Sequence, residues 1–191
     1  HHKYKGYLGM IGLLDCNNFY VSCERLFYPA IRNKPVIVLS NNDGCAIARS
    51  EEAKQIGVKM GSPLHFITDL IKKHDIHVFS SNYTLYGDIS ARVMNVIRSM
   101  VEKVEVYSID EIFLDLSGHK YYDMVKLAVI LRQRVQQQTG IPVSIGIAPS
   151  KTLAKMANRY AKKYRRNEGV HLADSKERID HMLDVTEVGD I

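Results

Sequence analysis

The sequence contains no long hydrophobic run, no pattern of a secretory leader and no pair of closely spaced cysteines. A membrane span needs ~20 consecutive apolar residues, so we expect no membrane partner. The three cysteines, Cys16, Cys23 and Cys45, do not follow the spacing of a zinc site or a disulfide framework. Internal repeats and low-complexity tracts are missing as well. These absences favour a globular protein of the reducing cytoplasm.

Acidic residues are missing from one segment, residues 151–166, which holds seven lysines and arginines. The segment carries a formal charge of +7. The net charge of the whole chain is +5, so the rest of the chain sums to −2. Basicity concentrated in this way is typical of a surface that contacts phosphate groups. The alternative is a solvated helix face, which is the commoner role of a run of charges.

Hydrophobic periodicity predicts interleaved strands and helices, and therefore a mixed α+β fold class. Apolar runs predict strands over residues 10–15, 35–40, 45–48, 77–80, 104–116 (with a bend near 109–112) and 143–147. Helical spacing predicts helices ending near 27 and over 50–56, 63–73, 83–101, 121–138 and 151–164. Asn17 and Asn18 are candidate caps for the first helix. We interpret residues 1–9 as a tag or linker remnant, with Met10 as the natural start.

Three acidic residues lie where a carboxylate is costly. Asp15 closes an apolar strand, and Asp110 and Glu111 stand side by side within another apolar stretch. A buried carboxylate needs a compensating partner, and Mg²⁺ prefers such oxygen ligands. The sequence therefore suggests a site for one or two divalent ions. The plainer alternative, a hairpin turn at 110–111, stays open at this point.

The basic segment predicts a helix that Ser150 or Thr152 begins. Lys151 and Lys155 are four residues apart and share one face of it. Free N–H groups at a helix N-terminus attract anions, so the two lysines could hold a triphosphate or a DNA phosphate.

Four motifs together resemble the Y-family DNA polymerases, most closely the UmuC type, the catalytic subunit of bacterial polymerase V. They are found, in family order, at residues 15–20, 39–49, 107–111 and 146–155. The resemblance implies a polymerase-type palm with ferredoxin-like βαβ elements, formed by residues 10–18 and 82–173. It further implies a small fingers subdomain at 19–81 and the start of a thumb at 174–191, with the rest of the thumb and the little finger absent.

The resemblance also implies the metal chemistry. Asp15, Asp110 and Glu111 correspond to the catalytic, metal-binding carboxylates, and the carbonyl of Cys16 to a further metal ligand. The implied cofactor is Mg²⁺, as two ions, with Mn²⁺ able to substitute.

Substrate roles follow from the same resemblance. Tyr20 stands at the steric-gate position, where its ring would exclude a ribose 2′-OH. The implied dNTP-binding residues are Asn18, Phe19, Tyr20, Lys54 and Lys155, and those assigned to DNA are Lys151, Arg159, Lys162 and Lys163.

Two departures from the family pattern concern the same regions. Asn17 stands where many members have a second aspartate, outside the three main ligands. Residues 51–54 replace a Tyr-Glu-Ala-Arg stretch, so Lys54 would offer a point charge in place of a guanidinium fork. UmuC-type members share this second departure.

The implied function is template-directed nucleotidyl transfer from a dNTP to a DNA primer 3′-OH, in low-fidelity translesion synthesis during an SOS-type damage response. The implied partners are primer-template DNA, a UmuD-type subunit and the recombinase filament. Two alternatives remain: a nucleotide-cyclase-like two-metal enzyme, and a catalytically weak or inactive DNA-binding or regulatory fragment of the same fold.

Overall fold

The computed structural model describes residues 9–164 and 169–185. The chain divides into two compact units, the first formed by His1–Asn17 with Ser90–Ile191 and the second by Asn18–Ile89. Of the interpreted tag, only Gly9 lies within the described residues, and residues 186–191 of the thumb prediction lie outside them.

A five-stranded sheet forms the centre of the first unit, in the order β5-β6-β1-β7-β8. Its strands are β1 Ile11–Cys16, β5 Val104–Ser108, β6 Glu111–Asp115, β7 Val143–Ala148 and β8 Val170–Leu172. All neighbours are antiparallel except β7 and β8, which run parallel. With α4 (Tyr83–Arg98) and α5 (Tyr121–Thr139), the chain follows the β-α-β-β-α-β order of a ferredoxin-like fold. The predicted mixed α+β class is confirmed.

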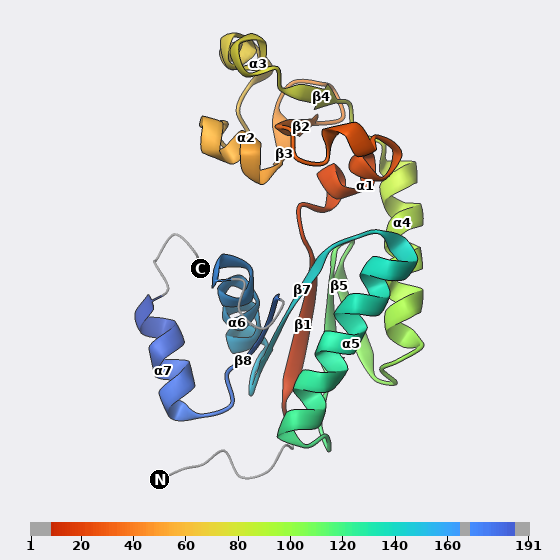
Figure 1. The fold of residues 1–191 in the computed structure, drawn as a ribbon, viewed down its shortest axis with the longest axis vertical. Coiled ribbons are helices and arrows are strands. Elements are labelled where there is room, and N and C mark those ends of the chain that lie inside the picture. The colour runs from red at the N-terminus through yellow and green to blue at the C-terminus, as the bar shows by residue number, and fades with distance from the viewer. Residues whose placement is uncertain (1–8, 165–168, 186–191) are drawn as a thin grey trace. The chain divides into compact units, whose positions relative to one another are not determined.

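Helices cover both faces of this sheet (Figure 1). On one side lies α5, and on the other lies α6 (Lys151–Tyr164) with α7 (Lys176–Val185) packed against it. Leu13 of β1 and Phe113 of β6 are buried beneath α6 and α7. Ile112, between Phe113 and Glu111, is fully buried as well. Both faces of the five-stranded sheet carry apolar residues, because helices cover each face.

Close contact between α6 and β7 depends on Gly146. A Cβ atom at this position would lie 2.1 Å from the backbone N of Asn158 and 2.5 Å from the carbonyl of Ala154. The buried Asn158 side chain donates to the carbonyls of Leu13 (3.2 Å) and Ser144 (2.8 Å), which ties the helix to β1 and β7. The height of α6 above the sheet is therefore set by backbone contact.

The second unit has a three-stranded sheet in the order β3-β2-β4. Its elements are α1 Phe19–Phe27, η1 Pro29–Ile31, β2 Val36–Leu39, β3 Ala46–Arg49, α2 Glu51–Ile56, η2 Leu64–Phe66, α3 Thr68–His74, β4 His77–Phe79 and the first turns of α4. Strand β2 is antiparallel to β3 and parallel to β4. The buried Ser50 side chain accepts from the N–H groups of Ala53 (3.1 Å) and Val36 (2.9 Å), so it caps α2 and joins it to β2.

Two local predictions need correction, and one strand was missed. Asn18 is the N-cap of α1, but its backbone is left-handed (φ 43°) and its side chain does not cap the helix. The single helix predicted over 63–73 is divided into η2 and α3, because Ile67 (φ −115°) is not helical. Strand β8 was not predicted, because three residues are too few to show a period.

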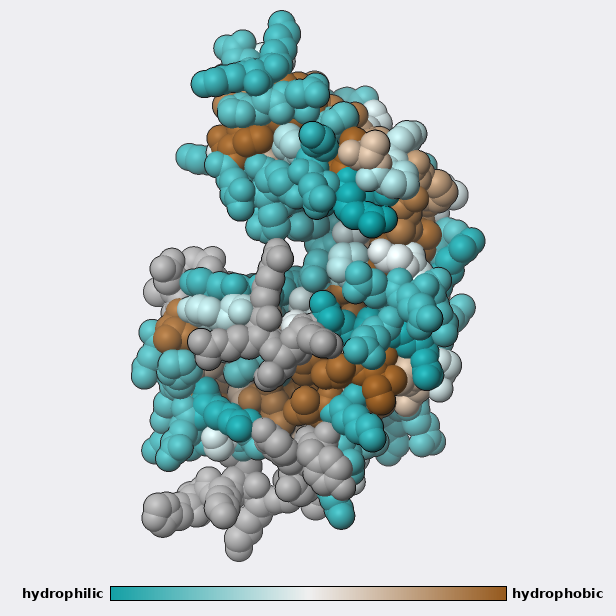
Figure 2. Space-filling model, viewed as in Figure 1, coloured by the Kyte–Doolittle hydropathy of each residue, from teal (hydrophilic) through white to brown (hydrophobic). Residues whose placement is uncertain are grey.

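Hydrophilic side chains dominate much of the viewed surface, with hydrophobic residues reaching it in patches (Figure 2). Tyr107 of β5 is one of the exposed large hydrophobic residues, at 54% exposure. Within the described residues, no helix combines the length and apolarity required to cross a bilayer.

Candidate functional site

Two of the predicted carboxylates lie opposite each other in the sheet of the first unit. Asp15 of β1 is the register partner of Glu111, the first residue of β6. Asp110 precedes Glu111 in the turn, where its carbonyl accepts from the N–H of Cys16 (2.9 Å). Acids that are far apart in the sequence are thus brought to one end of two neighbouring strands.

The turn at Asp110 and Glu111 is held by Ser108. Its hydroxyl lies 2.9 Å from Oδ1 of Asp110 and 3.1 Å from Oε1 of Glu111. The β5–β6 register shifts between Val106 and Ser108, so a β-bulge stands immediately before the carboxylates. Bulges re-aim side chains and are frequent next to functional sites. The hairpin-turn alternative is therefore correct as local structure, and the turn presents two acids.

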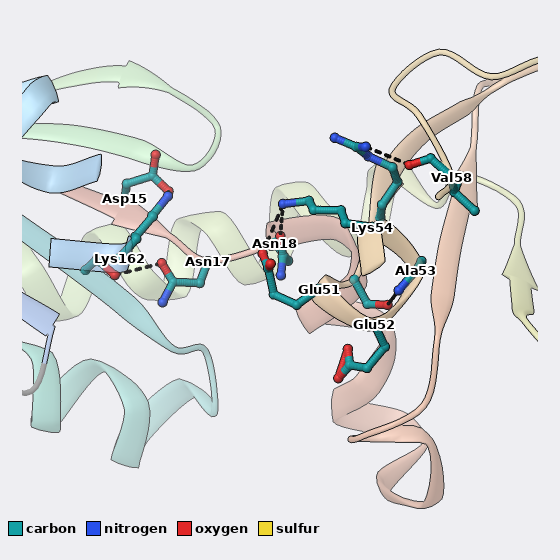
Figure 3. A network of polar contacts seen from close by, with 12 residues as sticks. Asp15, Asn17, Asn18, Glu51, Glu52, Ala53, Lys54, Val58 and Lys162 are labelled. Atoms are coloured by element: carbon teal, nitrogen blue, oxygen red, sulfur yellow. Dashed lines mark hydrogen bonds and ion pairs between the residues drawn. The ribbon is translucent and has the colours of Figure 1, made fainter. Parts of the chain in front are cut away.

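A lysine of α6 reaches Asp15 (Figure 3). Nζ of Lys162 lies 2.6 Å from Oδ1 of Asp15, whose side chain is 18% exposed. Burial raises the pKa of Asp15 to about 6. The ammonium of Lys162 opposes this rise, while the negative charges of Asp110 and Glu111 add to it. The carboxylates therefore repel one another at neutral pH, and Lys162 offsets part of that repulsion.

The donor set suits a hard divalent cation, because it consists of carboxylate oxygens that share an unfavourable negative charge. As the side chains stand, however, no group of three His, Cys, Asp or Glu residues comes together to hold a metal ion in the part of the chain that the structure describes. Lys162 and Ser108 bind the oxygens that a cation would take. The metal-ligand set thus stays a prediction, with suitable chemistry and side chains that would have to turn.

The lysines on the sheet side of α6 all have partners on the sheet. Lys151 pairs with Glu105 of β5 (2.8 Å) and lies 5.1 Å above the Phe113 ring. Nζ of Lys155 lies 3.1 Å from the hydroxyl of Tyr107 and 4.1 Å from its ring centroid. Of the remaining residues assigned to DNA, Arg159 and Lys163 are exposed, whereas Lys162 is the partner of Asp15.

This row of contacts follows from matched repeat distances. Four residues along a helix rise ~6 Å, and two residues along a strand rise ~6.6 Å. Lys151 and Lys155 therefore keep step with Glu105 and Tyr107 when helix and strand run side by side.

The predicted residues of the second unit form a separate polar group (Figure 3). Nζ of Lys54 on α2 lies 3.0 Å from Oε1 of Glu51 and 3.4 Å from Oδ1 of Asn18. Lys54 therefore points toward the N-terminus of α1, where Asn18 and Phe19 were expected to face a triphosphate. Phe19 itself is buried, at 4% exposure.

Aromatic side chains surround Tyr20. Its ring stacks on Tyr86 of α4 (centroids 4.4 Å apart, planes at 19°) and meets Tyr83 edge-on. Tyr86 is fully buried and donates to Oε1 of Glu24 (2.9 Å). Desolvation raises the pKa of Glu24, and the hydrogen bond from Tyr86 opposes that rise. The half-buried Tyr20 ring thus rests on an anchored neighbour.

Four residues of these sites were given no role from the sequence: Ser108, Tyr107, Asn158 and Tyr86. Ser108 and Tyr107 lie just before the acids in the sequence, and this position could have marked them. Asn158 and Tyr86 look like ordinary helix positions in sequence, because their partners come from distant segments.

Comparison with known proteins agrees with this architecture. The impB/mucB/samB family profile matches residues 14–159. The chain is 46% identical over 185 residues to the protein ImpB of Salmonella typhimurium, and 44% identical over 184 residues to the protein UmuC of Salmonella typhimurium strain LT2. Each alignment covers 95% of this chain and 44% of the relative, so the chain spans less than half the length of these relatives.

A solved Y-family DNA polymerase chimera of Dbh and Dpo4 has the same fold. The TM-score is 0.80 at 25% identity, over 95% of this chain and 53% of the other. The sequence-based resemblance to the Y family and its UmuC type is confirmed, and the chain belongs to the impB/mucB/samB family of Y-family polymerase proteins.

Proposed function

We propose that the chain carries the nucleotidyl-transfer site of a low-fidelity DNA polymerase, which joins a dNTP to the 3′-OH of a primer paired with a template. The observation that carries this proposal is the register of Asp15 opposite Glu111, with Asp110 tied to the same strand end. Asp15 and Glu111 on the strands and Asp110 in the turn can therefore turn their carboxylate oxygens toward one shared metal site.

In the reaction, Asp15, Asp110 and Glu111 would hold divalent ions, with the carbonyl of Cys16 as a further ligand. Bound there, such ions favour the attacking hydroxyl and stabilise the leaving oxygen. The residues of the chain align the groups and supply fixed charge, since phosphoryl transfer asks little covalent chemistry of a protein. Lys162 and Ser108 keep the acids in place until ligands arrive.

The nucleotide-binding residues are assigned from the family resemblance, with Lys155 in the first unit and Asn18, Phe19, Tyr20 and Lys54 in the second. Lys155 and Lys54 would each contact phosphate as a point charge, and the backbone amides at Asn18 and Phe19 are assigned to the triphosphate. Tyr20 excludes a 2′-OH. Its stacking on Tyr86 supports this role, because a ring that excludes a hydroxyl by steric overlap must stay fixed in position.

DNA contact is assigned to the exposed α6 residues Lys151, Arg159 and Lys163, and to Lys162. We assign residues 10–18 and 82–173 to the palm, 19–81 to the fingers and 174 onward to the start of the thumb, whereas the two compact units divide the chain between Asn17 and Asn18 and between Ile89 and Ser90. Translesion synthesis in an SOS-type response is proposed because relatives include UmuC. Contacts with a UmuD-type subunit and the recombinase filament stay predictions.

A binding experiment tests the carboxylate site. Isothermal titration of dATP into the chain, with and without Mg²⁺, is compared for the wild type, Asp110→Asn and Asp115→Asn. The control removes the same charge from the other end of β6, where Asp115 accepts from the N–H of Ser117 (2.9 Å). We expect Mg²⁺-dependent binding to weaken about tenfold or more in Asp110→Asn alone. Equal binding by all three proteins would refute the site.

Primer extension tests the reaction itself. This chain is placed in the Dbh-based polymerase in exchange for the matching 53%. Extension that requires a template and is abolished by Asp110→Asn supports a polymerase. Cyclisation of a nucleotide without a primer would favour the cyclase-like alternative. Magnesium-independent DNA binding with no reaction in a folded chimera would favour the non-catalytic alternative.

A further inference from the structure

Lys155 differs from the other lysines on the sheet side of α6 in the charge of its partner. Among the described residues, Lys151 pairs with the carboxylate of Glu105, and Lys162 with that of Asp15. The contacts of Lys155 are with the neutral hydroxyl and ring of Tyr107. A carboxylate neutralises the charge of the ammonium group that it pairs with. A ring and a neutral hydroxyl fix the position of the ammonium group but leave its positive charge unneutralised.

The ring of Tyr107 packs against a buried residue of the sheet. Its ring meets that of Phe113 edge-on, with centroids 5.5 Å apart and planes at 70°. Phe113 is 4% exposed and belongs to the core beneath α6. One side of the Tyr107 ring is thus packed, while the residue as a whole stays 54% exposed.

The β-bulge of β5 explains how Ser108 can reach the acids, while Tyr107 lies on the same side of the strand as Glu105 by ordinary alternation. Strict alternation would send Tyr107 and Ser108 to opposite faces of the sheet. The register shift between Val106 and Ser108 allows Ser108 to contact Asp110 and Glu111 while Tyr107 contacts Lys155. One local irregularity thus lets two neighbouring residues serve the acids and the lysine.

We propose that Tyr107 is a positioning residue that holds Nζ of Lys155 for the phosphates of an incoming nucleoside triphosphate. The inference rests on the proposed function and extends it to a residue that makes no contact with the reacting atoms. Its physical basis is pre-organisation: a lysine already fixed in one direction loses less rotamer freedom when phosphate binds. Tyr107 provides this order without lowering the charge that phosphate needs.

The test measures binding of inorganic triphosphate, in the presence of Mg²⁺, to the chain and its variants. Tyr107→Leu removes ring and hydroxyl, whereas Tyr107→Phe keeps the ring. Tyr28→Leu is the matched control, because Tyr28 is 52% exposed and packs on Phe79 of the second unit. We expect binding to weaken about two- to tenfold in Tyr107→Leu, to stay within about twofold in Tyr107→Phe, and to be unchanged in Tyr28→Leu.

A double-mutant cycle with Lys155→Met separates positioning from general damage to the fold. If Tyr107 acts through Lys155, Tyr107→Leu has no further effect in the Lys155→Met background. Carbon-13 NMR of the dimethylated lysines supplies a second readout. The Lys155 methyl signal should be shifted by the ring of Tyr107, keep that shift in Tyr107→Phe and lose it in Tyr107→Leu.

Several results would overturn the proposal. They are the absence of triphosphate binding by the wild type, unchanged or tighter binding by Tyr107→Leu, and additive effects in the cycle. A single-stranded oligonucleotide is titrated in parallel, and a loss confined to that ligand would assign Lys155 to DNA phosphate and refute the triphosphate assignment. Triphosphate binding and the methyl signal need no polymerisation, so a failed primer extension with an intact cycle would refute only the proposed function.

Discussion

Gly146→Ala is the substitution for which the structure makes the sharpest prediction. The added Cβ would lie 2.1 Å from the N of Asn158, 2.5 Å from the O of Ala154 and 2.6 Å from the C of Ala157. These are backbone atoms, so no side-chain rotation can relieve the contact. To reach the 3.0 Å below which Cβ contacts essentially never occur, α6 or β7 must move by about 0.9 Å.

The energetic cost has two parts. Overpacking a close interface costs ~1–3 kcal/mol, and the two hydrogen bonds of Asn158 contribute ~1 kcal/mol each if they are stretched. We therefore expect Gly146→Ala to lower the free energy of unfolding by roughly 2–5 kcal/mol. The same displacement carries Lys155 and Lys162 away from Tyr107 and Asp15, so triphosphate binding should weaken with stability.

Urea unfolding followed by circular dichroism measures the effect. Gly87→Ala is the matched control, since a Cβ at this position in α4 would have no atom within 4 Å apart from its chain neighbours and the backbone of its own helix. It should raise the free energy of unfolding by ~0.5–1 kcal/mol, because alanine is the better helix former. If Gly146→Ala unfolds at the same urea concentration as the wild type and binds triphosphate equally well, the close packing of α6 on β7 is refuted.

Three further predictions concern the site and its support. Burial raises the pKa of Asp15 from 3.8 to about 6. The folded state therefore binds the carboxyl proton of Asp15 more tightly than the unfolded state does. The stability that this protonated carboxyl contributes is lost as the pH rises from about 4 to 6. Asp15→Asn should therefore stabilise the chain above pH 6 by on the order of 1–3 kcal/mol and flatten the pH profile of urea unfolding, and an unchanged profile would contradict the buried position of Asp15. Asn158→Ala should lower the free energy of unfolding by about 2 kcal/mol in the same assay, because two buried hydrogen bonds are lost, and a loss below ~0.5 kcal/mol would show that its amide does not join α6 to the sheet. Tyr20→Ala in an active chimera should increase ribonucleotide incorporation in single-nucleotide extension assays, with Tyr28→Ala as control, and constant sugar discrimination would refute the steric-gate assignment.

Much of the fold could be predicted from local sequence. Buried strands such as β2 and β7 show as apolar runs, and α6 shows its apolar stripe with basic residues outside it. Ser150 and Thr152 were the two candidate starts of α6, and the structure selects Ser150, whose Oγ accepts from the N–H of Leu153 (3.2 Å). These features depend on residues within one or two turns of each other, which periodicity and capping describe directly.

The three acids could be singled out from the sequence, and the motifs around them identified the family. A carboxylate in an apolar strand is costly whatever the fold, so Asp15, Asp110 and Glu111 stand out in the amino-acid pattern itself. Their spacing in the chain, however, contains no information on which strands become neighbours.

Tertiary structure alone decided the partners. Pairing of β1 with β6 set Asp15 opposite Glu111, and the height of α6 over Gly146 brought Lys162 to Asp15 and Lys155 to Tyr107. The β-bulge before Ser108 could not be predicted, because a one-residue register shift leaves the amino-acid pattern unchanged while altering which face each side chain takes. Sequence determined which residues could do chemistry, and long-range packing determined which of them meet, since contacts between distant segments depend on the whole sheet.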